Sequence, residues 1–587
     1  MLMMTKKMIF SIVLGFVAVL LPLTVEAQVA KQVVVTKAYV PEVSEAVKLP
    51  IEPNMVDTVK MRPEIDYSIT PQMYATDLAT HRFKPATVTY WEFDRTKNFY
   101  AKVGAGYALN TIGDIYASTM NTRVGYLMAY LNHLGQFGER ENYAHKKVNA
   151  MQMQNRVGVA GGLYCGKRML EGDVNYNSEI YHRFAGDGSQ IDFEDINFKL
   201  RFGDNFTDFS RVNFDVSLYG NFFNDKAGWL AENQQRLQET HAGVKARVAR
   251  EFKRHYVEIG IGYDGRWGMH DLADYADNMA SLGLMYGYKT DNMEIMLGAD
   301  YCYDRLKAIP EASNYLLPKA KVRLNVGKRN VATPFFEVNS SVESNSYHSL
   351  LQRNPYLAFD VTNQNSTPNS VNYDLRLGIE GRFAKDKFAY RLYMGGLFTP
   401  KSIYWYNLDY MLMHFHVDKR NVGSLNLEMD YKPTNRLEFS AGLHGYIYSK
   451  APKLLVGGGS PMTLLGGRPS MEAYFKARYN FGKISVGLSA DFCSRREWSL
   501  WNTVQTIDTE GSEGTEGVVD TPTTPTTNYP SFTAPFYADV SLDVDWQVAK
   551  QCTLFLEGHN LANMKIYRWA YYNDLGIHFT VGARVNF

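Results

Sequence analysis

The stretch GIHFTVGARVNF, residues 576–587, alternates between apolar and polar side chains up to its last residue. One set is wholly apolar: Ile577, Phe579, Val581, Ala583, Val585 and Phe587. The intervening set is glycine or polar: Gly576, His578, Thr580, Gly582, Arg584 and Asn586. Because successive side chains of a strand point to opposite faces of a sheet, this pattern predicts a strand with one apolar and one polar face.

The same alternation recurs along the chain, and it favours strands that cross a membrane. Similar runs occupy residues 537–548, 484–492, 437–447, 257–267 and 212–218. Each has about the length that a tilted strand needs to cross a bilayer, and the apolar faces often begin or end on aromatic residues. The polar faces repeatedly carry charges, as in Asp539, Asp543 and Asp545, which is typical of a wet lumen. The alternative is a soluble sandwich, which would bury its apolar faces against each other.

Composition narrows the classes of function. Lys and Arg number 62 and Asp and Glu 61, so the net charge of +1 gives no basic surface for nucleic acid. The 4 cysteines lie far apart without a CxxC pair, which argues against a zinc site. The sequence contains no HExxH, no GxSxG and no phosphate-binding glycine loop. We therefore expect no enzymatic activity and no cofactor.

Residues 1–27 read as a signal peptide. Lys6 and Lys7 precede an apolar stretch, and Val25-Glu26-Ala27 resembles a cleavage site, so the mature chain would begin near Gln28. An uncleaved membrane anchor is the alternative. No later apolar run is long enough for a membrane helix, so we expect an exported protein that crosses a membrane only as strands.

Over the whole chain the alternation predicts an all-β fold, a transmembrane antiparallel β-barrel of about 22 strands spanning residues 97–587. The expected strands are 97–107, 112–122, 124–137, 152–165, 168–182, 192–203, 210–222, 238–251, 255–266, 278–288, 292–303, 317–327, 331–343, 371–383, 386–398, 419–432, 434–447, 468–481, 483–494, 536–549, 551–560 and 576–587. Short links such as 549–551 alternate with long ones such as 344–370, 399–418 and 495–535. Outer-membrane barrels alternate short periplasmic turns with long extracellular loops, so both termini should be periplasmic.

The C-terminal stretch LEGHNLANMKIYRWAYYNDLGIHFTVGARVNF resembles the closing hairpin of TonB-dependent receptors. Asn560 and Leu561 end the penultimate strand, and an aromatic loop, a glycine and the final strand follow. The resemblance implies that the last strand is read by the machinery that inserts barrels into the outer membrane. The residues that would carry this assembly signal are Phe579, Val581, Val585 and Phe587.

The N-terminal part departs from that family. TonB-dependent receptors carry a globular plug before the barrel, whereas residues 28–96 are rich in proline and show no helix–strand alternation. We expect them to form an extended periplasmic or lumenal segment. Within it, KQVVVT at 31–36 resembles the TonB box, with Val33, Val34, Val35 and Thr36 at the matching positions. Any strand-prone segment near a mature terminus could also give this match.

A barrel of this strand number is roughly 40 Å across and needs a closure. Residues 28–96, inward-folded loops or a partner protein could supply it. The loop 505–533 is acidic and rich in Thr, Gly and Pro, so we expect it to lie outside the barrel. The loop 399–418 is dense in aromatic residues and could pack on other loops, bind a ligand or touch a partner.

The same loop holds a weak metal half-site. His414, His416 and Asp418 alternate, so an extended chain would point all three to one side. The alternative is an ordinary polar face opposite Phe415 and Val417.

These observations predict an outer-membrane barrel for the passage or uptake of material, linked to TonB if the resemblance at 31–36 is functional. The alternative is a non-transporting scaffold, or an assembly or export component, that works with envelope proteins. The expected partners are outer-membrane lipid, the barrel-assembly machinery through the last strand, TonB, and a protein that plugs or covers the lumen.

Overall fold

A computed structural model describes residues 98–121, 123–206, 210–226, 236–326, 331–358, 365–455, 461–501 and 530–587. The expected signal peptide, the segment 28–96 and most of the loop 505–533 therefore lie outside the described residues.

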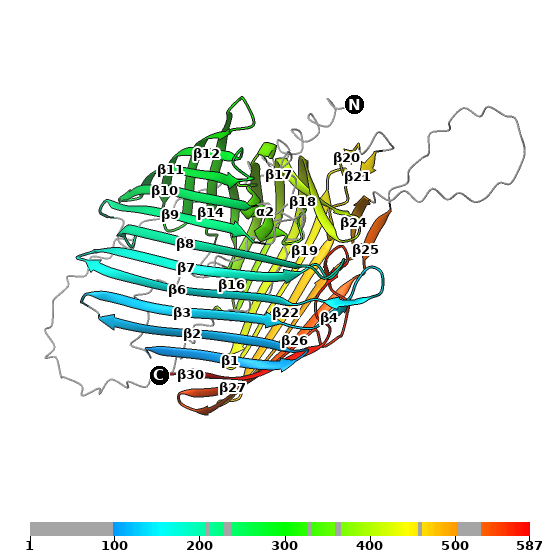
Figure 1. The fold of residues 1–587 in the computed structure, drawn as a ribbon. Coiled ribbons are helices and arrows are strands. Elements are labelled where there is room, and N and C mark those ends of the chain that lie inside the picture. Colours follow the sequence, from blue (N-terminus) through cyan, green and yellow to red (C-terminus); the bar gives the residue numbers. More distant parts are fainter. Residues whose placement is uncertain are drawn as a thin grey trace, which may run out of the picture. The chain divides into compact units, whose positions relative to one another are not determined.

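The described residues form a closed antiparallel barrel of 22 strands, as the alternation predicted. The barrel strands are β1 Phe99–Tyr107, β2 Asn110–Asn121, β3 Gly125–Gln136, β6 Gln152–Cys165, β7 Arg168–His182, β8 Gln190–Asp204, β9 Asn213–Asp225, β10 Leu237–Phe252, β11 His255–His270, β12 Ala276–Lys289, β13 Met293–Leu306, β14 Ser313–Leu324, β15 Thr333–Glu343, β16 Ser370–Phe383, β17 Phe388–Leu408, β18 Leu412–Thr434, β19 Leu437–Tyr448, β22 Met471–Asn480, β23 Ile484–Cys493, β26 Tyr537–Ala549, β27 Cys552–His559 and β30 His578–Asn586. Each strand pairs with its sequence neighbour in the barrel (Figure 1).

The first and last strands close the barrel. β30 pairs antiparallel with β1, with Tyr100 opposite Asn586 and Tyr107 opposite Phe579. The backbone N–H of Phe99 donates to the carbonyl of Phe587, and the two rings stack with centroids 5.1 Å apart. The start of the first strand and the end of the chain therefore lie at the same end of the barrel. Most of the tight turns also lie there, so we call it the short-turn end and its opposite the long-loop end.

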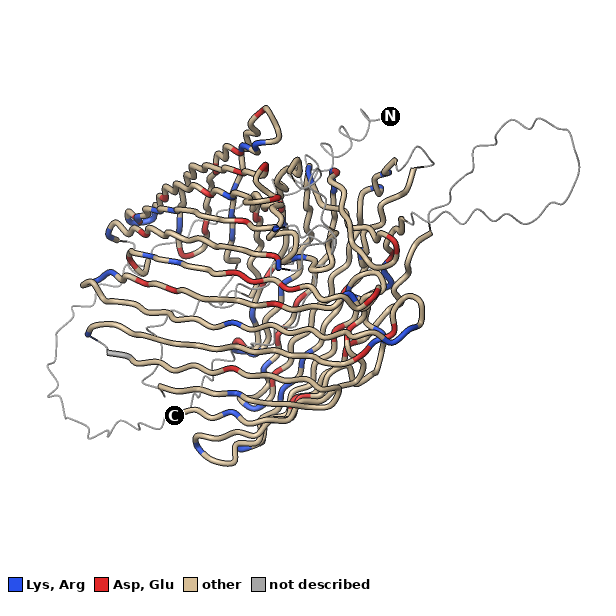
Figure 2. Tube along the Cα trace, viewed as in Figure 1, with Lys and Arg blue, Asp and Glu red and all other residues tan. Residues whose placement is uncertain are grey.

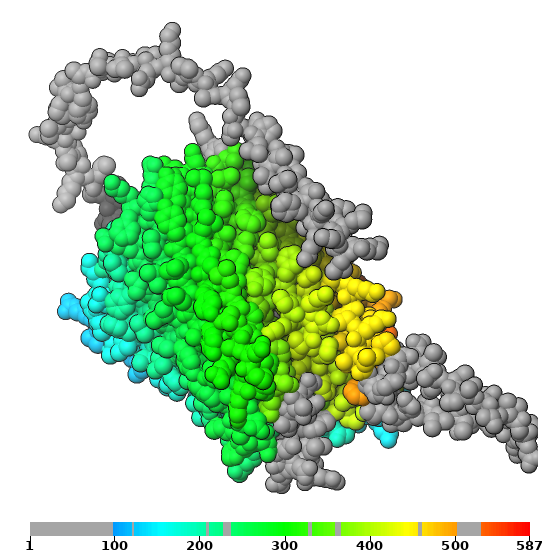
Figure 3. Space-filling view, turned by 90° about the horizontal axis from the view of Figure 1, so that it is seen from above, coloured from blue at the N-terminus to red at the C-terminus, as the bar shows by residue number. Residues whose placement is uncertain are grey.

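The outer face of the wall is apolar, because the alternation of each strand places one set of side chains outward. Along β11, Val257, Ile259 and Ile261 are exposed by 38%, 48% and 58%. Exposed Val and Leu side chains follow the same period in the neighbouring strands. Figure 3 shows the outside of this wall over its green and yellow part. Such a surface suits contact with lipid.

The inner face is polar and paired, as expected for a wet lumen. Arg584 of β30 forms ion pairs with Asp545 of β26 at 2.9 Å and Glu557 of β27 at 3.2 Å. Lys102 of β1 reaches the same Glu557 at 2.9 Å. These bridges connect strands on both sides of the closing seam.

Shorter elements gather at the long-loop end. The small strands are β4 Glu139–Glu141, β5 Lys147–Asn149, β20 Lys453–Leu454, β21 Met462–Thr463, β24 Arg496–Trp501, β25 Ser531–Ala534, β28 Tyr567–Trp569 and β29 Tyr572–Asn573. The helix α2 spans Tyr347–Arg353 between β15 and β16. Within the described residues no helix is both long and apolar enough to cross a membrane.

Candidate functional site

The segment 344–369, which joins β15 to β16, carries the candidate site, although its residues 359–364 are not described. It contains α2, whose N-cap residue Ser346 accepts a hydrogen bond from the backbone N–H of Ser349. This side chain satisfies one of the free amide groups at the start of a short helix. Tyr347, Leu350 and Leu351 of α2 are buried.

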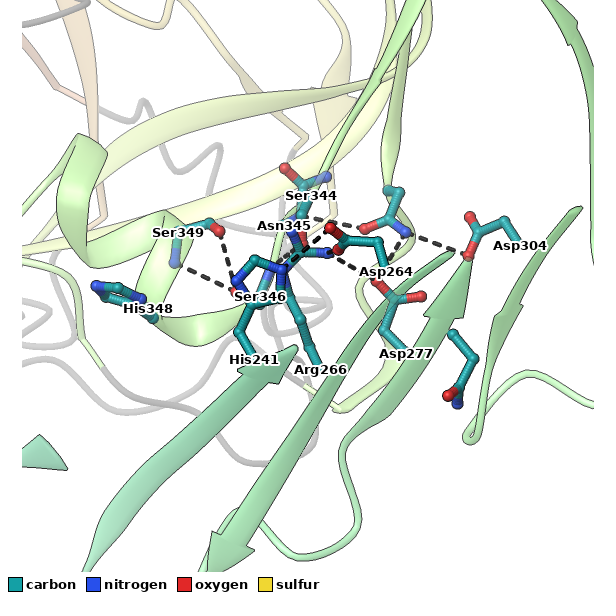
Figure 4. Close-up of polar contacts among 12 residues, drawn as sticks. His241, Asp264, Arg266, Asp277, Asp304, Ser344, Asn345, Ser346, His348 and Ser349 are labelled. Carbon is teal, nitrogen blue, oxygen red and sulfur yellow. Dashed lines mark hydrogen bonds and ion pairs between the residues drawn. The ribbon is translucent and has the colours of Figure 1, made fainter. Parts of the chain in front are cut away.

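Carboxylates of the lumen wall hold the end of this segment. The side-chain amide of Asn369 donates to Asp277 at 3.0 Å and to Asp304 at 3.2 Å. Its oxygen accepts from the backbone N–H of Asn345 at 3.2 Å, which fixes the orientation of the amide. Both N–H groups therefore face the carboxylates, and we call this arrangement the asparagine clamp. Figure 4 shows Asp277 and Asp304 beside the strands of the wall, with Asn345 between them and α2.

Two further carboxylates bind α2 itself. Glu239 of β10 accepts from the backbone N–H of His348 at 3.1 Å, and Asp225 of β9 accepts from the hydroxyl of Tyr347 at 2.7 Å. The imidazole of His348 stacks on Phe223 of β9, with centroids 4.4 Å apart. The helix is thus bound by polar and aromatic contacts to the inside of the wall.

Arg266 of β11 balances part of this negative charge. Its guanidinium lies 2.5 Å from Asp264 and 3.8 Å from Asp277, the clamp carboxylate. Asp264 also accepts from the hydroxyl of Tyr219 at 2.8 Å and lies 3.0 Å from His241 (Figure 4). Because Asp277 is fully buried and Asp264 is 6% exposed, these pairs lie where charge interactions are strong.

His348 and Tyr347 of α2 are held neutral. Burial is the main cause that lowers the pKa of His348 to about 3, and the neighbouring His241 and Arg266 act in the same direction. Burial also raises the pKa of Tyr347 well above its ordinary value, and the carboxylate of Asp225 acts in the same direction. At neutral pH α2 therefore adds no charge to the wall carboxylates through these two side chains.

The long loops pack on α2 in one apolar cluster, which we call the loop core. Its buried members are Ala150, Tyr181, Phe184, Ala185, Ile191, Phe193, Phe223, Leu237, Leu272, Tyr347, Leu350, Leu351, Tyr356, Leu357, Ile403, Trp405, Met413, Phe415, Trp498, Ala534, Trp569, Ala570 and Tyr572. Tyr356 and Tyr572 stack with centroids 3.6 Å apart, although they come from different loops. Segments far apart in sequence thus form a common cap at the long-loop end.

The expectation of a loop at 399–418 was wrong. β17 runs unbroken to Leu408 and β18 begins at Leu412, so the residues form a hairpin that continues the barrel wall. Ile403 and Trp405 enter the loop core, whereas Tyr404 and Tyr406 pack in a second cluster with Met462 and Leu464. From Ile403 to Tyr406 both faces of the hairpin are buried against aromatic or aliphatic side chains, so this stretch lacks the alternation of the other strands. Of the roles considered, loop packing is confirmed.

The three weak metal candidates lie along β18. The ring of His414 stacks on Tyr406 at 5.3 Å, and its Nδ1 accepts from the backbone N–H of Phe415 at 3.0 Å. Asp418 accepts from the backbone N–H of Lys419, and His416 is half-buried. In the part of the chain that the structure describes, no group of His, Cys, Asp and Glu is placed to hold a metal ion.

The residues of the expected assembly signal lie on β30 at the seam. Phe579, Val581 and Phe587 are exposed on the outer face by 36%, 58% and 54%, and Val585 is half-buried. The TonB-box-like residues Val33–Thr36 lie outside the described residues. Both assignments stay predictions.

The clamp was not found by sequence reasoning. Asp277, Asp304 and Asn369 come from separate strands and a loop, and no local motif connects them. The nearest signal for the clamp is the repeated occurrence of charges on the polar faces of the strands. Alternation alone does not show which of these side chains lie next to each other in the lumen.

No protein-family model matches the chain, and no curated protein matches it. Solved structures do match. The FrpB iron transporter from Neisseria meningitidis has a TM-score of 0.62 at 10% identity, with 84% of this chain and 82% of that chain covered. The barrel has the TonB-dependent receptor fold.

Two other solved structures agree with this result. The siderophore receptor PirA from Acinetobacter baumannii has a TM-score of 0.61 at 9% identity, covering 83% of this chain and 80% of that one. The copper transporter OprC has a TM-score of 0.57 at 13% identity, covering 84% and 82%. The matched proteins are outer-membrane transporters and receptors rather than enzymes. The resemblance read from the C-terminal hairpin is thus confirmed for the fold.

Proposed function

We propose that this chain is an outer-membrane barrel that takes up a metal ion or a metal chelate through its long-loop end. The observation that carries the proposal is a closed 22-strand barrel with a receptor-type fold and a cap of packed loops at one end. The cargo class comes from the matched proteins, which are transporters of iron and copper and a siderophore receptor.

The cap supports a gated rather than an open passage. The asparagine clamp and the bonds to Glu239 and Asp225 hold the segment 344–369 against the wall. A ligand that contacts the cap would have to displace this segment to enter the lumen. Because these bonds are polar, water can replace them when the segment moves away.

Energy for uptake would come from TonB, which we propose binds Val33–Thr36 by strand addition in the periplasm. This places both termini on the periplasmic side, consistent with the meeting of β1 and β30 at the short-turn end. Residues 28–96 would then fill or cover the lumen from that side.

Uptake of labelled iron and copper, free and as siderophore chelates, tests the proposal in cells with and without TonB. We expect accumulation of one cargo that requires both the barrel gene and TonB. Equal accumulation with and without the barrel, across all these cargoes, would contradict the proposal. In planar bilayers the intact protein should conduct no ions. If removal of residues 28–96 opens a pore, the N-terminal segment closes the barrel; if the truncated protein also conducts no ions, the cap seals the barrel alone.

The second candidate function is a scaffold or export component that works with envelope proteins. The cap favours this second function, because it is held to the wall at several points and a scaffold does not need a passage for cargo. It requires stable co-purification with another envelope protein after mild detergent extraction. Recovery of the barrel alone, together with cargo uptake, would exclude it.

A further inference from the structure

The turns at the short-turn end are rich in cations. Their exposed basic residues are Arg123, Lys167, Lys253, Arg254, Lys385, Lys387, Arg436, Lys483 and Lys550. In the described parts of these turns the acidic residues are Asp291 and Asp386. Figure 2 shows blue segments at several strand ends on the left of the view. This end of the barrel is therefore positive, although the whole chain is nearly neutral with a net charge of +1.

A pocket of about 220 Å³ lies within this positive end. It is formed by two neighbouring turns and the ends of β6, β7 and β8. Its lining residues are Cys165, Lys167, Arg168, Asp204, Arg211 and Val212. The pocket thus combines three cations with one carboxylate.

The pocket lies on the outer, lipid-facing side of the wall. On β7, Arg168 has the same parity as Val174 and Tyr176, which are exposed by 56% and 39%. On β8, Asp204 has the same parity as Phe198, Leu200 and Phe202, all of which are exposed. Because alternate residues of a strand share a face, the pocket continues the apolar belt at its end.

The carboxylate neutralises only part of the positive charge. Asp204 is 3% exposed, and its Oδ1 lies 3.9 Å from Arg168 and 3.6 Å from Arg211. Its Oδ2 accepts from the backbone N–H of Phe214 at 3.1 Å, which fixes the side chain. The guanidinium of Arg168 lies over the ring of Phe214 at 4.5 Å. The two arginines are thus held in place while Lys167 is exposed, and among the lining residues three cations face one carboxylate.

We propose that this pocket binds the headgroup of an anionic phospholipid. Arg side chains form paired hydrogen bonds with phosphate oxygens, and long basic side chains at the edge of an apolar belt reach the headgroup region. The acyl chains would lie against the exposed Val, Leu and Phe side chains of β6 to β9. A free phosphate ion would satisfy the cations but would leave this belt uncovered. The lipid is therefore the occupant that uses both features.

Native mass spectrometry of the full-length protein in a mild neutral detergent tests this site. Phosphatidylglycerol and phosphatidylcholine are titrated separately. We expect the wild type to prefer phosphatidylglycerol. Each basic residue near an anionic lipid surface contributes about a fivefold gain in affinity, so Arg168→Gln with Arg211→Gln should weaken phosphatidylglycerol binding about 25-fold. Phosphatidylcholine binding should change much less.

Asp204→Asn changes the charge in the opposite direction and should tighten phosphatidylglycerol binding about fivefold. This variant keeps the test decisive if the arginine variant does not fold. Lys146→Gln with Lys147→Gln is the matched control, because both lysines are exposed at the long-loop end. The proposal is overturned if the wild type binds both lipids equally, if neither pocket variant changes the preference, or if inorganic phosphate occupies the pocket without any lipid preference.

Discussion

Substitution of Asn369 by alanine is expected to release the segment 344–369 from the lumen wall. The side chain is 4% exposed and donates to Asp277 and Asp304, which are 0% and 6% exposed. Asp277 and Asp304 are buried side by side, so the pair holds a shared proton near neutral pH and only one of them is a charged acceptor. A hydrogen bond contributes about 1.5–3 kcal/mol to a charged group and about 0.5–1.5 kcal/mol to a neutral one, so the two bonds together contribute at least about 2 kcal/mol. We use this lower value, because Arg266 remains 3.8 Å from Asp277 in the variant and water can reach the freed carboxylates.

Hydrogen exchange of α2 amides measures this loss. The backbone N–H of Leu350 donates to Ser346 and that of Asn354 donates to Leu350, each at 2.9 Å, so both amides report on the helix. A loss of about 2 kcal/mol in the free energy of local opening should accelerate their exchange about 30-fold. Amides of the barrel strands should keep their protection, because the clamp is confined to one segment.

Asn314→Ala is the matched control for this experiment. Asn314 is exposed at the long-loop end and accepts one hydrogen bond from the hydroxyl of Tyr301, at 2.6 Å. Its loss removes one neutral, solvated bond and should leave α2 unchanged. Exchange of the α2 amides within threefold of the wild type in Asn369→Ala would refute the reasoning that the clamp holds the segment.

Three other perturbations test the cap, the seam and the N-terminal segment. Because the pKa of His348 is lowered from 6.5 to about 3 in the docked helix, the docked state is fully stable above pH 6.5 and loses stability as the pH falls towards 3. At pH 5 the loss is about 2 kcal/mol, so the hydrogen exchange of α2 amides, corrected for its intrinsic rate, should rise about 30-fold. His348→Gln should abolish this pH dependence. Phe587→Ala removes the ring that stacks on Phe99 and should lower the amount of heat-modifiable barrel in the outer membrane severalfold, whereas unchanged amounts would exclude an assembly role. Val34→Pro should abolish TonB-dependent uptake at an unchanged barrel level, and retained uptake would show that 31–36 is not a TonB box.

Alternation predicted the barrel well because lipid and lumen impose opposite demands on the two faces of each strand. The final strand was expected at 576–587 and is observed at His578–Asn586, and the expected strand 255–266 begins at the observed residue His255. Alternation no longer predicted the strands correctly beyond the part that crosses the bilayer. Beyond Thr399, β17 is flanked by other loops on both faces, so its residues show no apolar–polar alternation.

The site was less predictable than the fold for a different physical reason. Ser346 and Asn354 are ordinary capping residues, but a helix of only 7 residues gives little periodicity to recognise. The position of α2 depends on carboxylates contributed by β9, β10, β12 and β13, which alternation assigns to the lumen without pairing them. Contacts between a loop and a distant wall depend on closure of the barrel, and a local pattern carries no information about them.

The two halves of the cap differ in what their displacement would cost. The β17–β18 hairpin continues the backbone ladder of the wall and buries Ile403, Trp405 and Phe415, so moving it would break strand hydrogen bonds and expose aromatic surface together. The segment 344–369 meets the wall through hydrogen bonds to carboxylates, which water can replace. It meets the hairpin differently, because Leu350 and Tyr356 are buried in the loop core and the backbone of Tyr356 and Ala358 is hydrogen-bonded to Met413. Opening of the long-loop end would therefore break replaceable polar bonds where α2 meets the wall, but it would expose apolar surface where the same segment meets the hairpin.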